Sequence, residues 1–264
     1  MALSYSSKLN KQHVLFPILS AAVLLVSIFA LSLNRDLFVF LHHWLRQIHL
    51  DVVWEALTFF GDAGVTPLIM IWFIARRPDL VWATLWASLL AYFVSHGLKP
   101  LVNELRPPAV LEHLDVLGPY LKYSSFPSGH ATTIFTCIGL LTLGIPTRGV
   151  TTWLLWIIGI TVALSRIAVG VHWPIDVLAG LMIGWLSASC GLWLASRYHS
   201  DSRGYYWIPL VVLLALVLFN LFGEPYGFKS LWLLQKVIAL LTGLLWFKFT
   251  LNWYRSKYLS QSPN

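Results

Sequence analysis

The first group of residues that could do chemistry lies between Lys99 and Pro108. It contains two cations, Lys99 and Arg106, with prolines close to both. Pro100 could begin a short helix and Pro107 could end it, which would place the two cations two turns apart on one face. Such a pair could bind an anion. Equally, each side chain could extend its charge to a membrane surface while its stem stays in apolar surroundings.

A second group, Ser125 to His130, immediately precedes an apolar run. Pro127 fixes the approach of the chain, Ser128 is a typical helix N-cap, and Gly129 would let a ligand come close to backbone N–H groups. Those N–H groups would lie at the positive end of a helix, which favours anions. Pro-Ser-Gly-His alone is weak evidence, because a capped helix start followed by a histidine is common.

The third group, Ser165 to Asp176, joins two further apolar runs and contains Arg166 and His172. Pro174 is expected in the first turn of the following helix. In that position the Asp176 carboxylate could cap the helix or hold the imidazole of His172, and one carboxylate can do both.

Membrane-spanning helices must position these groups. Of the 264 residues, 58% are hydrophobic and 11% charged, against about 25% charged in soluble domains. A bilayer crossing needs about 20 apolar residues, and we predict crossings at about 14–33, 56–75, 79–98, 129–145, 149–165, 174–196, 206–223 and 231–250. The segment 34–62 mixes aromatic and charged residues, which is typical of a helix along the interface. The predicted fold is all-α, a polytopic transmembrane helical bundle.

Charge and cysteine content exclude other classes. The net charge of +7 would suggest a nucleic-acid partner in a polar chain, but here Lys and Arg flank apolar runs, so we expect no nucleic acid. Cys137 and Cys190 lie within apolar runs, where a thiol behaves as a small hydrophobe. They predict neither disulfides nor a metal site.

Alternating crossings bring the three groups to one membrane face. They follow the third crossing, precede the fourth, and join the fifth to the sixth. Two histidines and an aspartate would offer ligands to a metal, but Lys99, Arg106 and Arg166 would repel a dication unless an anion intervened. Three cations around a helix N-terminus instead suit phosphate.

The three groups are the segments Lys99 to Arg106-Pro107, Pro127-Ser128-Gly129-His130, and Ser165-Arg166 to His172 to Asp176. Together, and in this order, they resemble the tripartite signature of the type-2 phosphatidic acid phosphatase superfamily. The resemblance covers residues 99–176. It implies a six-helix phosphatase core at 1–200, with residues 201–264 as an additional C-terminal transmembrane hairpin. The superfamily also contains soluble vanadium-dependent haloperoxidases, which the composition disfavours.

What the resemblance implies is a metal-independent phosphatase without a cofactor, acting on a lipid phosphate or pyrophosphate. His172 would form a phosphohistidine, with Asp176 fixing its tautomer. His130 would protonate the leaving oxygen and then activate water. The phosphoryl oxygens would be held by Lys99, Arg106, Arg166, the Ser128 hydroxyl and the Gly129 N–H. Spacing alone does not choose which histidine is the nucleophile.

The substrate class stays open among undecaprenyl pyrophosphate, phosphatidylglycerophosphate, phosphatidate and lipid A phosphates. The segment from Leu101 to Phe126 either covers the site or is a plain connection. No oligomeric state is predicted. A transporter or proton-conducting protein is an alternative, since Lys236 and Lys248 lie within the last crossing. A noncatalytic lipid-binding protein on the same fold is a second alternative.

The expected location is a bacterial plasma (inner) membrane, with the active site facing the periplasm or cell exterior. If the N-terminus is cytoplasmic, seven Lys and Arg residues lie outside. Three of these, Lys99, Arg106 and Arg166, belong to the candidate site, which leaves four. This orientation places nine inside, namely Lys8, Lys11, Arg76, Arg77, Arg148, Arg197, Arg203, Arg255 and Lys257. The excess of nine Lys and Arg residues inside over four outside supports this orientation, because cytoplasmic loops carry an excess of Lys and Arg.

Overall fold

The structure, a computed structural model, describes residues 11–47, 49–74, 77, 80–145, 147, 149–197, 207–223 and 227–258. Four cations of the orientation count, Lys8, Arg76, Arg148 and Arg203, lie outside the described residues, as does the predicted boundary between 200 and 201. Within the described ranges every regular element is a helix. The predicted all-α fold class is therefore confirmed.

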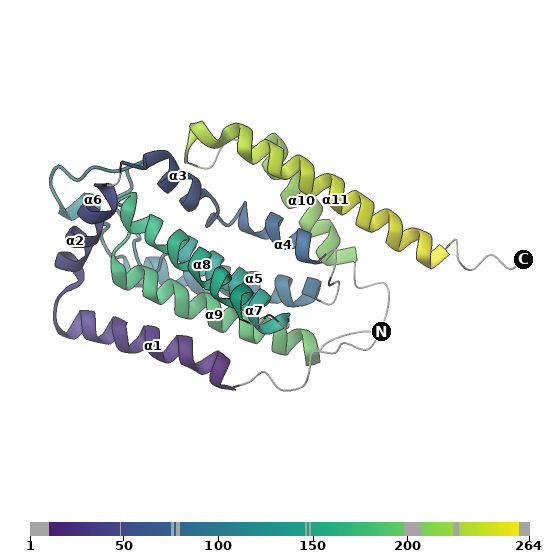
Figure 1. Cartoon of the computed structure of the whole chain (residues 1–264), viewed down its shortest axis with the longest axis horizontal. Helices are drawn as coiled ribbons and strands as arrows, with labels where there is room; N and C mark the ends of the chain where they lie inside the picture. Colours follow the sequence, from purple (N-terminus) through teal and green to yellow (C-terminus); the bar gives the residue numbers. More distant parts are fainter. Residues whose placement is uncertain are drawn as a thin grey trace, which may run out of the picture.

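The helices follow one another in an antiparallel bundle (Figure 1). Their bounds are α1 (Lys11–Ala30), α2 (Asn34–Arg46), α3 (Asp51–Phe59), α4 (Thr66–Ile74), α5 (Leu80–Val102), α6 (Pro107–Val110), α7 (Gly129–Gly144), α8 (Val150–Ala168), α9 (Pro174–Arg197), α10 (Trp207–Phe222), the short 3₁₀ turn η1 (Lys229–Leu231) and α11 (Trp232–Tyr258). Helices α5, α7, α8 and α9 form the centre, α1 covers one side, and α10 and α11 lie side by side on the other.

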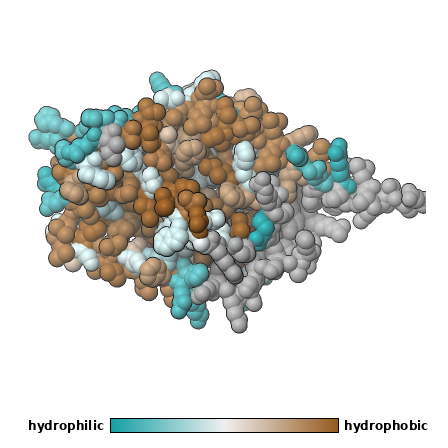
Figure 2. All heavy atoms as spheres, viewed as in Figure 1, coloured by the Kyte–Doolittle hydropathy of each residue, from teal (hydrophilic) through white to brown (hydrophobic). Residues whose placement is uncertain are grey.

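Large hydrophobic side chains are exposed on α1, α5, α8, α10 and α11. Figure 2 shows hydrophobic side chains over the middle of the bundle and hydrophilic ones gathered toward its ends. Among the described residues, five segments are long and apolar enough to cross a membrane: Lys11–Ala30, Leu80–Val110, Val150–Ala168, Pro174–Arg197 and Lys229–Asn252. Helix α7 is apolar but shorter. The chain is a multi-pass membrane protein.

The prediction of one apolar run at 56–75 is wrong in its continuity: a turn separates α3 from α4, although together they lead from one end of the bundle toward the other (Figure 1). Gly61 and Gly64 lower helix propensity there, and Gly64 N–H donates to Asp62 Oδ1 at 2.7 Å. This bond competes with helical hydrogen bonding. The Thr66 hydroxyl donates to the Phe60 carbonyl at 2.6 Å, which fixes the entry into α4. The interruption places Asp62 in the wall of a cavity.

A second expectation, the short helix between Pro100 and Pro107, is also wrong. Helix α5 continues through Pro100 to Val102, because a proline close to the helix end forfeits little hydrogen bonding. The chain leaves the helix at Asn103, whose φ is 47°, is extended at Arg106, and begins α6 at Pro107, a position that suits proline. Lys99 and Arg106 therefore come from a helix and a loop, rather than from one helical face.

Glycines bring the starts of α7 and α9 together. A Cβ on Gly184 would lie 2.4 Å from the Thr132 carbonyl oxygen, and one on Gly180 would lie 2.7 Å from the Ser128 carbonyl oxygen. Small residues spaced by four allow this close approach of helices. The Ser128 N–H also donates to the Asp176 carbonyl at 3.0 Å. The second and third sequence groups are thus held in one rigid unit.

Helix α2 secures the loops at the same end of the bundle, on the left in Figure 1. Its Arg46 forms ion pairs with Asp51 and Asp115. Buried His42 contacts the Ile167 carbonyl through Nδ1 at 2.9 Å. These contacts join α2 to the end of α8 and to the loop that follows α6.

Candidate active site

His172 and Asp176 form a buried pair at the polar end of the bundle. His172 lies in the turn before α9, and its Nδ1 is 3.3 Å from Asp176 Oδ2. The same oxygen accepts from Trp173 N–H at 2.9 Å and from the Ser125 hydroxyl at 2.5 Å. Asp176 therefore caps the start of α9 and also holds the imidazole, a combination that leaves the carboxylate little freedom to turn.

The other ring nitrogen of His172 faces Arg106. Nη1 of Arg106 lies 3.3 Å from His172 Nε2. A guanidinium can only donate, so this contact needs a lone pair on Nε2 and a proton on Nδ1. Burial and the neighbouring Arg106 hold the pKa of His172 well below its usual value. The imidazole is therefore neutral, with its proton on Nδ1 and with a lone pair on Nε2 that faces Arg106.

Two of the cations are held by backbone carbonyls. Arg106 donates through Nε to the Tyr123 carbonyl at 2.9 Å and through Nη1 to the Val171 carbonyl at 3.2 Å. Lys99 Nζ donates to the carbonyls of Ser124 at 2.9 Å and Pro127 at 3.2 Å. Carbonyls orient these side chains without cancelling their charge. In the described part of the chain neither cation pairs with a carboxylate within 4.0 Å.

Arg166, near the end of α8, is the third cation. Its Nη1 donates to the Thr58 hydroxyl of α3 at 2.5 Å. Its Nε is buried and has no hydrogen-bond partner among the described residues. A buried donor without a partner is costly, and an anion in the adjoining cavity would satisfy it. Thr58 is a contributor that sequence reasoning missed.

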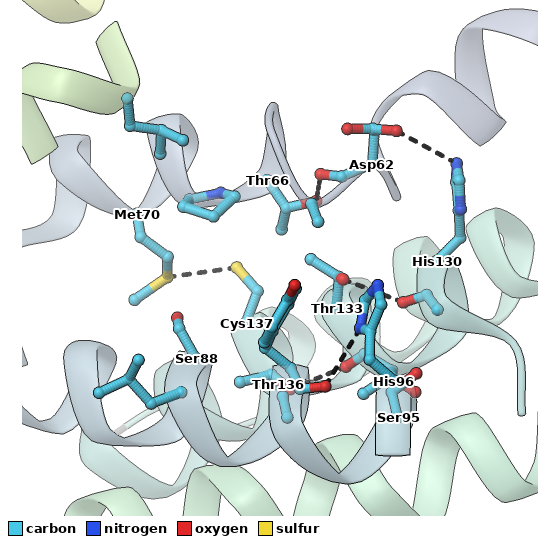
Figure 3. Close-up of a pocket in the computed structure, with 18 of the residues that line it drawn as sticks. Asp62, Thr66, Met70, Ser88, Ser95, His96, His130, Thr133, Thr136 and Cys137 are labelled. Atoms are coloured by element: carbon cyan, nitrogen blue, oxygen red, sulfur yellow. Dashed lines mark hydrogen bonds and ion pairs between the residues drawn. The ribbon is translucent and has the colours of Figure 1, made fainter. Parts of the chain in front are cut away.

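His130 faces a carboxylate that sequence reasoning also missed. His130 Nε2 lies 3.6 Å from Asp62 Oδ2, and the two side chains point toward each other in Figure 3. Asp62 belongs to the turn between α3 and α4. The signal for Asp62 in the sequence was a carboxylate next to an apolar run. It was overlooked because Asp62 was assigned to the interfacial segment expected at 34–62.

These groups line one cavity of about 780 Å³. Six of the eight predicted residues contribute to its wall: Lys99, Arg106, Gly129, His130, Arg166 and His172. Asp176 lies behind His172. Ser128 is fully buried outside the lining, and its hydroxyl accepts from the Ala131 N–H at 3.4 Å as the cap of α7. The structure thus brings seven of the predicted residues together at or directly behind one cavity, whereas the Ser128 hydroxyl caps the helix.

A cationic cavity beside a histidine–carboxylate pair, set at one end of a membrane bundle, defines a class of membrane enzyme that acts on phosphates. The model of the PAP2 superfamily matches residues 80–203. The chain is 32% identical over 159 residues to the putative undecaprenyl-diphosphatase YbjG of Escherichia coli, covering 54% of this chain and 74% of that protein. It belongs to the PAP2 superfamily, as the signature indicates.

Two further comparisons agree. An undecaprenyl-diphosphatase of Sulfolobus acidocaldarius is 36% identical over 129 residues, which is 47% of this chain and 58% of that protein. The crystal structure of Aquifex aeolicus LpxE matches with a TM-score of 0.55 and 30% identity, covering 61% of this chain and 94% of that one. The predicted class of enzyme, a phosphatase acting on lipid phosphate esters, is confirmed.

Proposed function

We propose that the protein hydrolyses the terminal phosphate of a lipid phosphate or pyrophosphate through a phosphohistidine on His172. The observation that carries this proposal is the environment of that imidazole. Its Nδ1 lies on the Asp176 carboxylate, and its Nε2 faces a cavity lined by three cations. A neutral imidazole oriented in this way is a nucleophile beside a phosphate-binding site.

In the first step His172 Nε2 attacks phosphorus, and the bond to the leaving oxygen breaks as His130 protonates that oxygen. The resulting imidazolium is stabilised by Asp176. In the second step His130 removes a proton from water, which attacks phosphorus and breaks the P–N bond, releasing inorganic phosphate. Lys99, Arg106 and the Gly129 N–H hold the phosphoryl oxygens as charge builds up in both transition states.

Asp62 acts as a positioning residue for His130 in this scheme. Asp62 Oδ2 lies 3.6 Å from His130 Nε2. The other ring nitrogen, Nδ1, is therefore the one that exchanges the proton with the substrate in this scheme. Asp62 is itself held by the Gly64 N–H, so the turn between α3 and α4 fixes the orientation of the acid.

Metal independence is the testable core of this proposal, since the cations supply the charge neutralisation that a metal would otherwise give. Purified protein in mixed micelles should release phosphate from at least one of undecaprenyl pyrophosphate, phosphatidylglycerophosphate, phosphatidate and lipid A. Activity should persist in excess EDTA and be inhibited by vanadate, which mimics pentacoordinate phosphorus. Loss of activity in EDTA that magnesium or zinc restores would refute the mechanism, and no release across the panel would favour a noncatalytic lipid-binding protein.

The placement of the charged residues supports a phosphatase over a transporter. Lys236 Nζ donates to the carbonyls of Gly223 at 2.5 Å and Asn220 at 3.3 Å, so it caps the end of α10. The three cations of the candidate site, Lys99, Arg106 and Arg166, lie at one end of the bundle. An ion path would instead need charges throughout the bilayer depth.

We further propose that the site faces the periplasm or cell exterior of a bacterial plasma membrane. Glu112 is exposed beside the site, and Arg197 is exposed at the opposite end of the bundle. In a background without Cys137 and Cys190, an impermeant thiol reagent should label Glu112→Cys in intact spheroplasts. The matched Arg197→Cys protein should react only after lysis. The reverse pattern would put the site on the cytoplasmic face.

A further inference from the structure

We propose that α10 of the C-terminal hairpin forms one wall of a groove that holds a single hydrocarbon chain of the substrate. The family match ends at residue 203, before α10 begins. The hairpin would thus add chain recognition to a phosphatase core that ends near residue 200. The identity of the head group rests on the proposed function, whereas the groove rests on separate observations.

The groove and the candidate active site are one continuous cavity. One face of α5 lines it at Val81, Leu85, Ser88, Tyr92 and Lys99. With a rise of ~1.5 Å per residue, Val81 lies about 27 Å along the helix from Lys99. One leaflet of a bilayer contributes about 15 Å of hydrocarbon, half of the ~30 Å core. A chain whose phosphate is bound near Lys99 can therefore follow α5 past the bilayer midplane.

The far part of this cavity is apolar. Figure 3 shows Met70 of α4 and Cys137 of α7 beyond the region where His130 meets Asp62. Thr133 and Thr136 also line it, but their hydroxyls donate to carbonyls of their own helix at 2.9 and 2.8 Å. Their methyl groups are therefore the parts available to a ligand. This lining suits hydrocarbon rather than a polar head group.

Helix α10 contributes Val212, Ala215, Leu216 and Phe219 to the lining. Their spacing of three, four and seven residues places them on one helical face. Val211, next to Val212, is 59% exposed and lies outside the lining. Val212 and Phe219 are themselves 47% and 60% exposed, so this face of α10 borders an open groove, whereas Val211 lies on another face.

The hairpin is anchored close to the catalytic end. Buried Asn220 of α10 donates through Nδ2 to the Gly64 carbonyl at 2.9 Å, within the turn that carries Asp62. Gln235 of α11 in turn donates to the Asn220 carbonyl at 3.1 Å. The position of α10 is thus fixed relative to His130, so its apolar face is a permanent wall of the groove.

The volume of the cavity suits a single bound molecule. The cavity of about 780 Å³ lies within the range of roughly 300–1,000 Å³ that is typical of pockets holding one small molecule. It therefore has room for a chain beside the head group. Together with the length along α5, this points to a substrate whose chain extends beyond one leaflet.

A pair of adjacent valines tests the proposal in the full-length protein. Val212→Trp should obstruct the groove, and Val211→Trp is the matched control on another face of α10. The probes are undecaprenyl diphosphate and geranyl diphosphate, which share a head group and differ in chain length. We expect Val212→Trp to lower kcat/KM for undecaprenyl diphosphate at least tenfold and to change it less than twofold for geranyl diphosphate. Val211→Trp should change neither by more than twofold.

Photocrosslinking separates this inference from the proposed function. An undecaprenyl phosphate analogue with a diazirine in the middle of its chain should label α10 in the parent protein and in Val211→Trp, and label it at least tenfold less in Val212→Trp. Labelling of α10 without phosphate release would retain the groove and reject the proposed function. Phosphate release without labelling of α10, or an equal loss of activity toward both diphosphates, would overturn the groove.

Discussion

A His172→Ala variant should form no acid-labile phosphoprotein when it is mixed with a labelled aryl phosphate and quenched rapidly. The substitution removes the nitrogen that would become bonded to phosphorus, so the covalent step has no alternative acceptor in the proposed mechanism. The imidazole is 2% exposed, and its loss leaves Asp176 without the group that it orients. Turnover of every substrate should fall to background.

His130→Ala should behave in the opposite way toward the same substrate. An aryl phosphate has a good leaving group and needs little protonation, so the variant should still be phosphorylated. The second step then lacks its general base, whose contribution is typically about 10²- to 10⁴-fold. Phosphoenzyme should therefore accumulate more in this variant than in the parent protein. Asp62→Asn should show the same accumulation more weakly, because it disturbs the orientation of His130 without removing it.

The measurement is the amount of trapped phosphoprotein against quench time, followed by its stability in acid and in base. Thermal unfolding of each detergent-solubilised variant provides a control for folding. Phosphoprotein in the His172 variant together with none in the His130 variant would mean that the two roles are exchanged.

The sequence could predict the site because the three signature groups are local and their order is read directly. Lys99 and His172 are far apart in the chain, yet alternating crossings place their segments on one membrane face whatever the details of packing. The structure adds the contacts between them, such as Arg106 Nη1 near His172 Nε2 at 3.3 Å. Such contacts depend on the path of the loop after Pro100, which local propensity predicted incorrectly.

Asp62 shows why the rest could not be predicted. Its role arises from the break between α3 and α4, and hydropathy averaged over a window does not resolve a turn of a few residues inside an apolar run. Ser128 was predicted to bind phosphate but does not line the cavity. A serine at this position suits both a helix cap and a phosphate ligand, and only the packing of α7 against α9 decides that its hydroxyl caps Ala131 N–H. Both residues depend on how helices pack, which spacing does not encode.

Asp176→Asn should reduce the rate of phosphoenzyme formation by roughly 10²- to 10⁴-fold, because loss of one partner of a buried ion pair costs about 3–5 kcal/mol and the phosphorylated His172 would carry a positive charge. The side chain is fully buried and accepts hydrogen bonds from both Ser125 and Trp173. An asparagine can keep these bonds and the contact to His172 Nδ1 through its oxygen, because all three are made to Oδ2. Its NH₂ group would then take the place of Oδ1, which is buried and has no hydrogen-bond partner among the described residues. The variant keeps the tautomer of His172 and loses the negative charge that would stabilise the phosphorylated imidazolium.

Ser125→Ala is the matched control, because it removes a hydrogen bond to the same carboxylate oxygen and leaves the charge in place. A single hydrogen bond to a charged group contributes about 1.5–3 kcal/mol, shared here with the Trp173 N–H, so we expect a loss of about tenfold or less. Rates of phosphoenzyme formation from an aryl phosphate, measured by rapid quench for both variants, make the comparison. Equal losses in Asp176→Asn and Ser125→Ala would show that the carboxylate serves mainly to hold the start of α9. A much larger loss in Asp176→Asn, at unchanged thermal stability, is the result expected if the charge of the carboxylate stabilises the phosphorylated imidazolium.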